Sequence, residues 1–169
     1  MAAITPTSTE IRKAIAESLK SIPDVDYLKP EQKLIVEHVV HRKDVFASLP
    51  TGFGKSLTFQ LLPSVYKALY DQGFDVPSSP VVIVVSPLSS IVKDQVGYLR
   101  SVGFEAAFIG ESEKQDKDII EGKVKSQFLY GSPESFVGDT KFREMFSQLH
   151  YRRNVVAVVC DEVHTVVHW

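Results

Sequence analysis

The sequence predicts an α/β fold, in which a mostly parallel, open sheet carries helices on both faces. Two apolar runs, Val81–Val85 (VVIVV) and Val155–Cys160 (VVAVVC), are typical of parallel strands buried on both faces. Segments with apolar residues at helical spacing alternate with such runs. Because strands and helices alternate along the chain, parallel pairing with helices packed on the sheet is favoured.

The first part of the chain is predicted to begin with two helices. Thr7 and Glu10 stand at capping-box spacing before apolar residues at helical spacing, so a helix is expected from there to about Ser21, before Pro23. A second helix is expected after Pro30. The residues expected to share one face of this second helix are Leu34, Ile35, His38 and Val39.

A strand, a turn and a long helix are predicted next. Asp44–Leu49 (DVFASL) is short and apolar and is followed by Pro50, which predicts a buried strand. A glycine-containing turn follows, and then a helix from about Lys55 to Tyr70. Pro77–Pro80 (PSSP) is predicted to be a loop.

The remaining elements continue the alternation. A helix is expected at Leu88–Arg100, and further strands are expected at Ala106–Ile109 and Gln127–Tyr130. In open parallel sheets, ligands bind beyond the carboxyl ends of the strands. Functional residues are therefore expected directly after the predicted strands.

Composition excludes several classes of protein. The chain has 169 residues and a net charge of −2, which favours one domain and argues against a histone-like nucleic-acid binder, although a local basic groove stays compatible. Its one cysteine, Cys160, offers neither an internal disulfide nor a zinc cluster. No apolar run reaches the roughly 18 residues that span a bilayer, and no secretory signal pattern is present. An intracellular location is expected.

A candidate phosphate loop lies at Leu49–Ser56 (LPTGFGKS). It matches the pattern G-x-x-x-x-G-K-S/T except that Leu49 replaces the first glycine. Gly52 and Gly54 permit positive φ, so that successive N–H groups can point at phosphate oxygens. Lys55 is expected to neutralise the β- and γ-phosphates, and the Ser56 hydroxyl to coordinate Mg²⁺. The alternative is an ordinary strand-to-helix turn.

An acidic box, Asp161–His164 (DEVH), directly follows the last predicted strand. Asp161 is expected to hold Mg²⁺, and Glu162 to orient and deprotonate the attacking water. His164 is expected to couple the nucleotide state to a bound partner. The alternative is a strand end with solvated acids, which the presence of a phosphate loop upstream disfavours.

These two motifs together resemble the superfamily 2 helicases of the DExH type and, more narrowly, the RecQ-like DNA helicases. The resemblance runs from Tyr27 to Trp169 and implies a RecA-like P-loop NTPase domain that binds ATP and Mg²⁺. Leu28–Gln32 (LKPEQ) resembles the adenine-reading motif of the family, which implies that Gln32 hydrogen-bonds adenine and that Tyr27 or Lys29 packs near its ring. The nucleotide-binding residues implied are Gln32, Pro50, Thr51, Gly52, Phe53, Gly54, Lys55, Ser56 and Asp161.

Two serine-proline turns and an aromatic segment resemble the family's DNA path. Ser86–Ser90 (SPLSS) and Ser132–Glu134 (SPE) resemble motifs Ia and Ib, and Thr165–Trp169 resembles the start of the aromatic loop after the acidic box. A base could stack on Trp169, a contact worth roughly 1–3 kcal/mol. The residues implied to bind single-stranded or duplex DNA are Ser86, Pro87, Leu88, Ser132, Pro133, Glu134 and Trp169.

One departure from the family lies inside the phosphate loop, where Phe53 stands in place of the glycine of many RecQ proteins. A stiffer loop, or an altered approach of nucleotide, is expected. Val163 replaces a small alanine, and Thr165–His168 differs from the usual sequence. None of these changes removes a group expected to touch phosphate or Mg²⁺.

The domain organisation expected is an N-terminal helical lead-in at 1–22 and a RecA-like ATP-binding domain at 23–169, ending after the DEVH box without a second RecA-like domain. In such motors the second domain supplies an arginine finger worth 10³–10⁵ in rate. Arg152 and Arg153 precede the last strand and are interpreted as solvated residues instead. The chain alone is expected to bind ATP–Mg²⁺ weakly, to hydrolyse it slowly or not at all, and not to unwind DNA.

Three functions stay open. The first is the ATP-binding half of a 3′–5′ DNA helicase with the catalytic residues Lys55, Glu162 and His164, acting in DNA repair and recombination, and nuclear in a eukaryote by resemblance. The second is a nucleotide- or DNA-binding module without turnover. The third, a small-molecule kinase, is disfavoured by Gln32 and the DEVH box.

Overall fold

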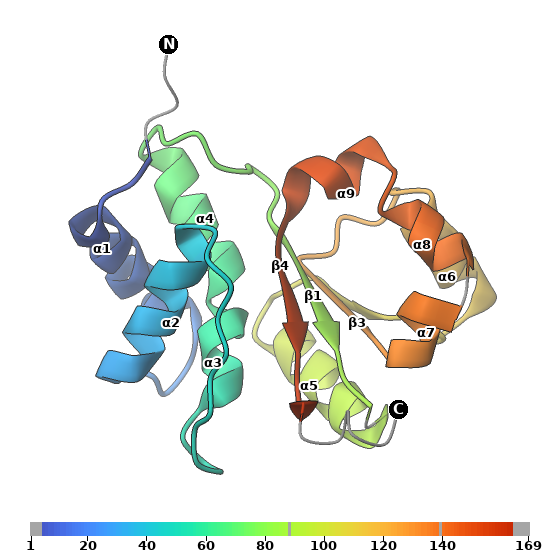
Figure 1. Ribbon diagram of the computed structural model, residues 1–169, viewed down its shortest axis with the longest axis horizontal. Coiled ribbons are helices and arrows are strands. Elements are labelled where there is room, and N and C mark those ends of the chain that lie inside the picture. Colours follow the sequence, from blue (N-terminus) through green and yellow to red (C-terminus); the bar gives the residue numbers. More distant parts are fainter. Residues whose placement is uncertain (1–4, 88, 139, 164–169) are drawn as a thin grey trace. The chain divides into compact units, whose positions relative to one another are not determined.

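The structure is a computed structural model that describes residues 5–87, 89–138 and 140–163 (Figure 1). The chain divides into two compact units, Met1–Pro80 and Val81–Trp169, here called unit 1 and unit 2. Unit 1 contains helices α1 (Ser8–Ser18), η1 (Leu19–Ser21, a 3₁₀ turn), α2 (Pro30–Val40), α3 (Lys55–Gln60) and α4 (Leu62–Asp71). Unit 2 contains a sheet and five further helices among the described residues.

The start of α1 confirms the predicted capping box. The Thr7 hydroxyl accepts the Glu10 N–H at 3.4 Å, and the Glu10 carboxylate accepts the Thr7 N–H at 2.7 Å. Two N–H groups that the first helical turn leaves without an intrahelical partner are satisfied in this way. The helix ends where the prediction placed it, because η1 carries it to Ser21.

The predicted buried face of α2 is wrong. Leu34 is 53% exposed, and the buried positions instead include two polar residues. The Glu37 carboxylate forms a 2.7 Å ion pair with Arg12 of α1. The Gln32 side chain donates a hydrogen bond to the phosphate loop. Because Gln32 and Glu37 both have polar partners, they can be buried, and the buried face differs from the one that hydropathy alone favours. The buried residues of α2 are Gln32, Val36, Glu37 and Val40.

Two further expectations for unit 1 are corrected. Asp44–Leu49 is not a strand: it forms no ladder, and all of its residues except the half-buried Leu49 are exposed. Apolar residues become a strand only when a neighbouring strand pairs with their backbone. The single helix predicted from Lys55 to Tyr70 is two helices that meet at Leu61, because Pro63 in the first turn of α4 has no N–H to continue the ladder of α3.

Unit 2 is built on a four-stranded, all-parallel sheet in the order β2-β3-β1-β4. The strands are β1 (Val81–Val85), β2 (Ala106–Phe108), β3 (Phe128–Gly131) and β4 (Val155–Cys160). Both β1 and β4 have the predicted bounds, and β2 and β3 lie within one residue of theirs. The parallel α/β class is thus confirmed.

Helices cover both faces of this sheet (Figure 1). On one face lies α5 (Ser89–Ser101), and on the other lie α6 (Glu113–Ile120), α7 (Pro133–Gly138), α8 (Thr140–Met145) and α9 (Leu149–Asn154). Side chains alternate across the sheet, so Ile83 and Leu129 join the core beneath the four helices. The members of this core are Val81, Ile83, Ala107, Ile109, Ile119, Leu129, Phe136, Phe142, Met145 and Tyr151.

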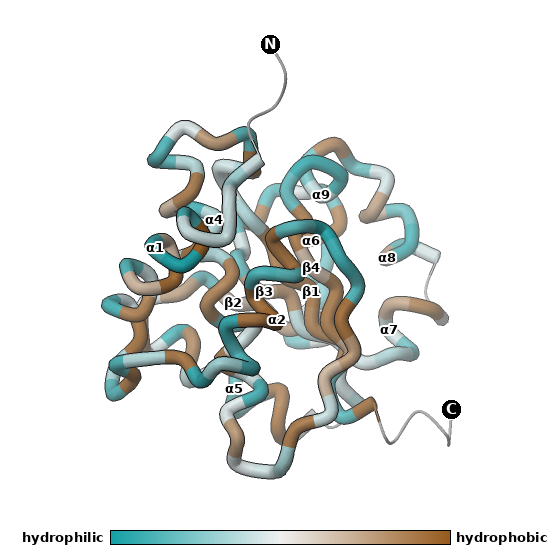
Figure 2. The backbone as a smooth tube through the Cα atoms, turned by 60° about the vertical axis from the view of Figure 1, so that its left-hand side comes forward, coloured by the Kyte–Doolittle hydropathy of each residue, from teal (hydrophilic) through white to brown (hydrophobic). Residues whose placement is uncertain are grey.

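The strands differ in burial as their positions in the sheet require. The first four residues of β1 and all of β3 are buried, whereas the end strand β4 is only partly covered, with Val158 60% exposed. The strands stand out as hydrophobic stretches in Figure 2. The central strands β1 and β3 therefore form the buried interior of the sheet. The end strand β4 leads into the acidic box at its carboxyl end.

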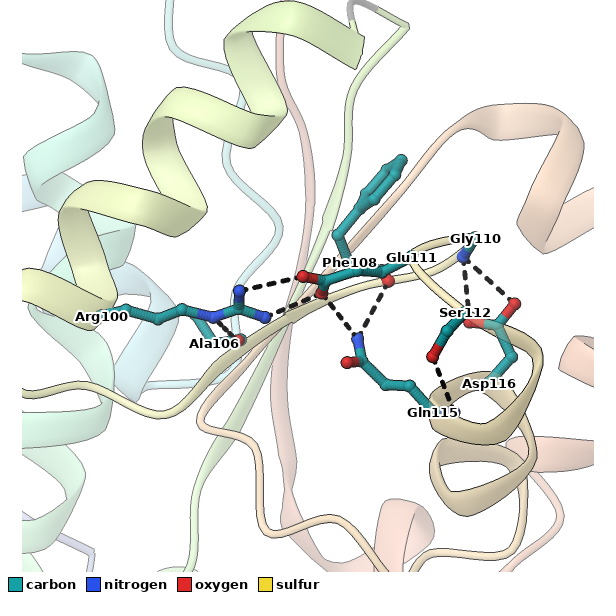
Figure 3. A network of polar contacts seen from close by, with 8 residues as sticks. All are labelled: Arg100, Ala106, Phe108, Gly110, Glu111, Ser112, Gln115 and Asp116. Carbon is teal, nitrogen blue, oxygen red and sulfur yellow. Dashed lines mark hydrogen bonds and ion pairs between the residues drawn. The ribbon is translucent and has the colours of Figure 1, made fainter.

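A polar network fixes the chain after β2 (Figure 3). The Arg100 guanidinium donates to the Ala106 carbonyl at 2.8 Å and, in a two-pronged ion pair, to both oxygens of Glu111 at 3.1 and 2.8 Å. Gln115 donates to the same carboxylate at 2.9 Å, and Asp116 accepts the Gly110 N–H at 2.9 Å. The end of α5, the loop after β2 and the start of α6 are tied together by these bonds.

Replacing Glu111 with Gln is expected to weaken unit 2 by about 0.2–1 kcal/mol at neutral pH, the range for a partly exposed pair. Hydrogen bonds, first from Arg100 and then from Gln115, lower the pKa of Glu111 to about 2. A lowered folded-state pKa gives stabilisation that is present above the unfolded value of about 4.5 and is lost as the pH falls toward 2. Urea unfolding of wild type and Glu111→Gln should thus converge at low pH. Glu144→Gln changes an exposed carboxylate on α8 and is the control. Its unfolding curve should match that of wild type at neutral pH as well as at low pH.

Candidate nucleotide site and nucleic-acid surface

The phosphate loop of unit 1 has the backbone that its glycines predicted. Gly52 and Gly54 lie at φ +76° and +86°, the left-handed region that favours glycine. The Phe53 N–H closes a turn on the Pro50 carbonyl at 3.2 Å, and Gly54 is the residue from which α3 starts. The loop thus leads directly into a helix N-terminus, an arrangement suited to phosphate groups.

The side chains of the Lys55-Ser56 pair occupy the first turn of α3, and both are half-buried. The Lys55 ammonium donates to the Leu49 carbonyl at 3.3 Å, so it folds back across its own loop. The predicted phosphate-binding cation therefore lies at the loop, as the motif requires.

Gln32 is built into the phosphate loop. It is only 3% exposed, and its Nε2 donates to the carbonyls of Phe53 at 3.1 Å and Gly54 at 3.0 Å, while its Oε1 accepts the Lys29 N–H at 2.8 Å. A Cβ added at Gly54 would lie 2.8 Å from Nε2, so the glutamine needs a glycine there. Because both N–H bonds of the amide are used, Gln32 has only acceptor capacity left.

Lys29 reaches the same part of the loop. Its ammonium lies 4.1 Å from the centroid of the Phe53 ring and donates to the Phe53 carbonyl at 3.3 Å. The first contact is a cation–π interaction. Two side chains of the LKPEQ segment, Lys29 and Gln32, therefore meet at Phe53. No local pattern predicts this contact, because 24 positions separate Lys29 from Phe53 and only the fold brings them together.

Tyr27 lies elsewhere in unit 1. It is 72% exposed and lines an open hollow of about 200 Å³ beside α1. Apolar side chains, among them Ile15, Leu19 and Leu28, make up most of this hollow. Of the two residues expected near the base, Lys29 is thus the one that contacts the phosphate loop.

Unit 2 gathers three predicted site residues at the carboxyl edge of its sheet. Ser86, Ser132 and Asp161 directly follow β1, β3 and β4. The Ser86 N–H donates to the carbonyl of Gly131 at 3.0 Å, and the Asp161 N–H donates to that of Val85 at 2.9 Å. The edge at which parallel α/β proteins bind ligands therefore holds the predicted residues side by side.

The two serines of this edge differ in their hydrogen bonding. The Ser132 hydroxyl accepts the Ser135 N–H at 3.2 Å and so caps α7, with Pro133 as the first residue of the helix. A hydrogen bond from the Ser132 side chain and, second, one from the backbone of Glu134 itself lower the pKa of the exposed Glu134 carboxyl. Ser86 is 3% exposed, and its hydroxyl has no hydrogen-bond partner among the described residues. A buried polar group of this kind is uncommon and often marks a functional position.

The first half of the acidic box forms a tight turn. Glu162 has a φ of +53°, and its N–H donates to the Asp161 carboxylate at 3.0 Å. This bond uses one of the two Asp161 carboxylate oxygens. The expectations for Leu88, His164, Trp169 and the Thr165–Trp169 segment lie outside the residues that the structure describes. Pro87 is described and is half-buried beside Ser86.

The parallel α/β fold and the glycine-lysine-serine loop that leads into α3 are features of P-loop nucleotide-binding proteins, although the described residues before the loop form no strand. The chain belongs to the DEAD/DEAH box helicase family, whose model matches residues 29–169. The RecQ resemblance is confirmed by its relatives. ATP-dependent helicase SGS1 of Saccharomyces cerevisiae is 31% identical over 97% of the chain, and RecQ-like DNA helicase blm-1 of Caenorhabditis elegans is 31% identical over 95%. ATP-dependent DNA helicase RecQ of Synechocystis is 29% identical over 94%.

The chain is much shorter than these relatives. It spans 11% of SGS1, 16% of blm-1 and 31% of the Synechocystis protein. Among solved structures, that of the helicase MrfA bound to DNA and AMPPNP matches with a TM-score of 0.65 and 18% identity, over 98% of this chain and 23% of that one. This match supports the helicase-type fold. Among the described helices, none combines the length and the apolar character that crossing a bilayer requires.

Proposed function

We propose that the chain is the ATP-binding half of a RecQ-like DNA helicase motor, with 3′–5′ polarity. The observation that carries the proposal is the loop of unit 1, in which two glycines at positive φ precede Lys55 and Ser56, with Gln32 joined to the loop backbone. Family membership and the RecQ-like relatives support the reaction class. A second RecA-like domain is proposed as the partner that completes the motor.

The proposed nucleotide site uses the loop for the phosphates and the LKPEQ segment for the base. The N–H groups at the start of α3 and the Lys55 ammonium bind the phosphates. Gln32, with its donors committed to the loop, offers a lone pair of Oε1 to the base. Adenine presents an amino group at the position where guanine presents a carbonyl, so this acceptor favours ATP over GTP.

From the sequence motifs, two side chains are proposed to contact Mg²⁺: the hydroxyl of Ser56 in the phosphate loop and the carboxylate of Asp161 in the acidic box. Both are oxygen donors of the kind that Mg²⁺ takes, and few protein ligands suffice because the ion keeps waters and binds substrate phosphates. No group of three His, Cys, Asp or Glu side chains within the described ranges could hold a metal ion. When bound, the ion would neutralise charge on the phosphates. Glu162 then accepts a proton from the attacking water.

The proposed DNA path follows the carboxyl edge of unit 2. Ser86 and Ser132 stand there beside helix starts, positions from which proteins contact nucleic-acid phosphates. Trp169 is proposed to stack on a base, and His164 to couple the DNA and nucleotide states. A role in DNA repair and recombination, and a nuclear location in a eukaryote, are proposed from the RecQ resemblance.

Binding of a fluorescent ATP analogue, with Mg²⁺ and with or without single-stranded DNA, tests the proposal. Wild type should bind, and Lys55→Ala should lose binding because the phosphates lose their cation. Single-stranded RNA in place of DNA tests the choice of nucleic acid. Lys67→Ala, which removes an exposed lysine of α4, is the control. Equal affinities of wild type and Lys55→Ala would contradict the phosphate-loop assignment.

A further inference from the structure

Phe53 is the common anchor of the two side chains that the LKPEQ segment directs at the loop. Its carbonyl accepts from both the Lys29 ammonium at 3.3 Å and the Gln32 amide at 3.1 Å, and its ring lies under the same ammonium at 4.1 Å. A glycine in this position would keep the carbonyl but would remove the ring. The ring contact is therefore the part of the anchor that depends on the residue type.

We propose that Phe53 is a positioning residue of the nucleotide site, which fixes Lys29 as a preformed cationic platform for the adenine ring. The inference rests on the proposed function, in which the base lies beside Lys29 and Gln32. It deepens that function by naming the residue through which the phosphate loop contributes to base binding.

The physical reason is preorganisation. A lysine side chain has several rotatable bonds, and ordering it at the moment of binding costs affinity. Lys29 is exposed, yet the Phe53 ring and carbonyl already hold its ammonium. A base that stacks on the open side of this ammonium therefore meets a cation with little ordering left to do, and the attraction between cation and ring adds to it.

The structure also separates this role from phosphate binding. Lys55 is the cation of the phosphate side, and it donates to the Leu49 carbonyl rather than to Phe53. Loss of the Phe53 ring should leave Lys55 and the glycine backbone unchanged. A ligand that has phosphates but no base should therefore be insensitive to the ring, whereas ATP should be sensitive to it.

The test compares ATP with inorganic tripolyphosphate as ligands of the 169-residue chain in the presence of Mg²⁺. Phe53→Leu keeps an apolar side chain but removes the aromatic face, and Lys29→Met keeps the length of the lysine but removes its charge. Each should weaken ATP binding by about twofold to fivefold, the range for an exposed cation–π contact, and should leave tripolyphosphate binding unchanged. Lys29→Met should lose at least as much affinity as Phe53→Leu, because it also removes the cation on which the base stacks, and the double variant should lose no more than Lys29→Met, because without the cation the ring has nothing to position.

Lys33→Met, an exposed lysine one turn along α2, is the matched control and should bind both ligands as wild type does. The inference is overturned if Phe53→Leu binds ATP as tightly as wild type or more tightly, or if it weakens tripolyphosphate as much as ATP. Urea unfolding of each variant checks that it is folded. If wild type itself binds ATP no better than Lys55→Ala does, the proposed function fails and the inference fails with it.

Discussion

Gly54→Ala is expected to weaken binding of the ATP analogue at least about tenfold, a loss of about 1.4 kcal/mol or more. The residue has a φ of +86°, where an alanine costs roughly 1–2 kcal/mol. Its Cβ would lie 2.8 Å from Gln32 Nε2, so one of the two must move. Either movement breaks the bonds that join Gln32 to the loop and leaves a buried amide without its partners, which costs about 1–3 kcal/mol.

Fluorescence titration with the analogue and urea unfolding together measure this effect. Gly73→Ala is the matched control: it also lies at positive φ, +90°, but no atom stands within 4 Å of its added Cβ. It should lose a similar amount of stability from backbone strain alone and should keep its affinity. If Gly54→Ala binds nucleotide as well as Gly73→Ala does, the hydrogen bonds between Gln32 and the loop have no part in nucleotide binding.

Glu162→Gln is expected to keep ATP binding and to lower hydrolysis about 10²- to 10⁴-fold, the usual contribution of a general base. Glutamine has nearly the same shape as glutamate but accepts no proton from water. The turn uses the backbone N–H of Glu162 on the Asp161 carboxylate, a donor that glutamine keeps. The change should therefore separate chemistry from binding.

Single-turnover hydrolysis of ATP tests this separation, measured beside analogue affinity and with the proposed second RecA-like domain supplied, because the chain alone is expected to turn ATP over slowly or not at all. Asp161→Asn provides the contrast, because it should reduce the dependence of binding on Mg²⁺ rather than spare binding. A Glu162→Gln protein that hydrolyses ATP at the wild-type rate would remove Glu162 from the mechanism. The expected difference between the two variants assigns separate roles to neighbouring carboxylates.

Local sequence determined much of this protein. The capping box of Thr7 and Glu10, the strands Val81–Val85 and Val155–Cys160 and the glycine backbone of the phosphate loop all follow from residue type and spacing. These features depend on interactions between residues close together in the chain, or on the conformational freedom of single residues. The serines and the aspartate after the strands were predictable for a related reason, since parallel strands bring their carboxyl ends to one edge.

Only the tertiary structure decided the rest, because the deciding partners are remote in sequence. Hydropathy predicted that Leu34 is buried, because it does not report the ion pair between Arg12 and the buried Glu37. It also predicted a strand at Asp44–Leu49, for which the described residues supply no pairing neighbour. The same holds for the meeting of Lys29 and Gln32 at Phe53. A local pattern reports which conformation a segment favours, whereas burial, pairing and side-chain contacts are fixed by whichever distant groups the fold brings to it.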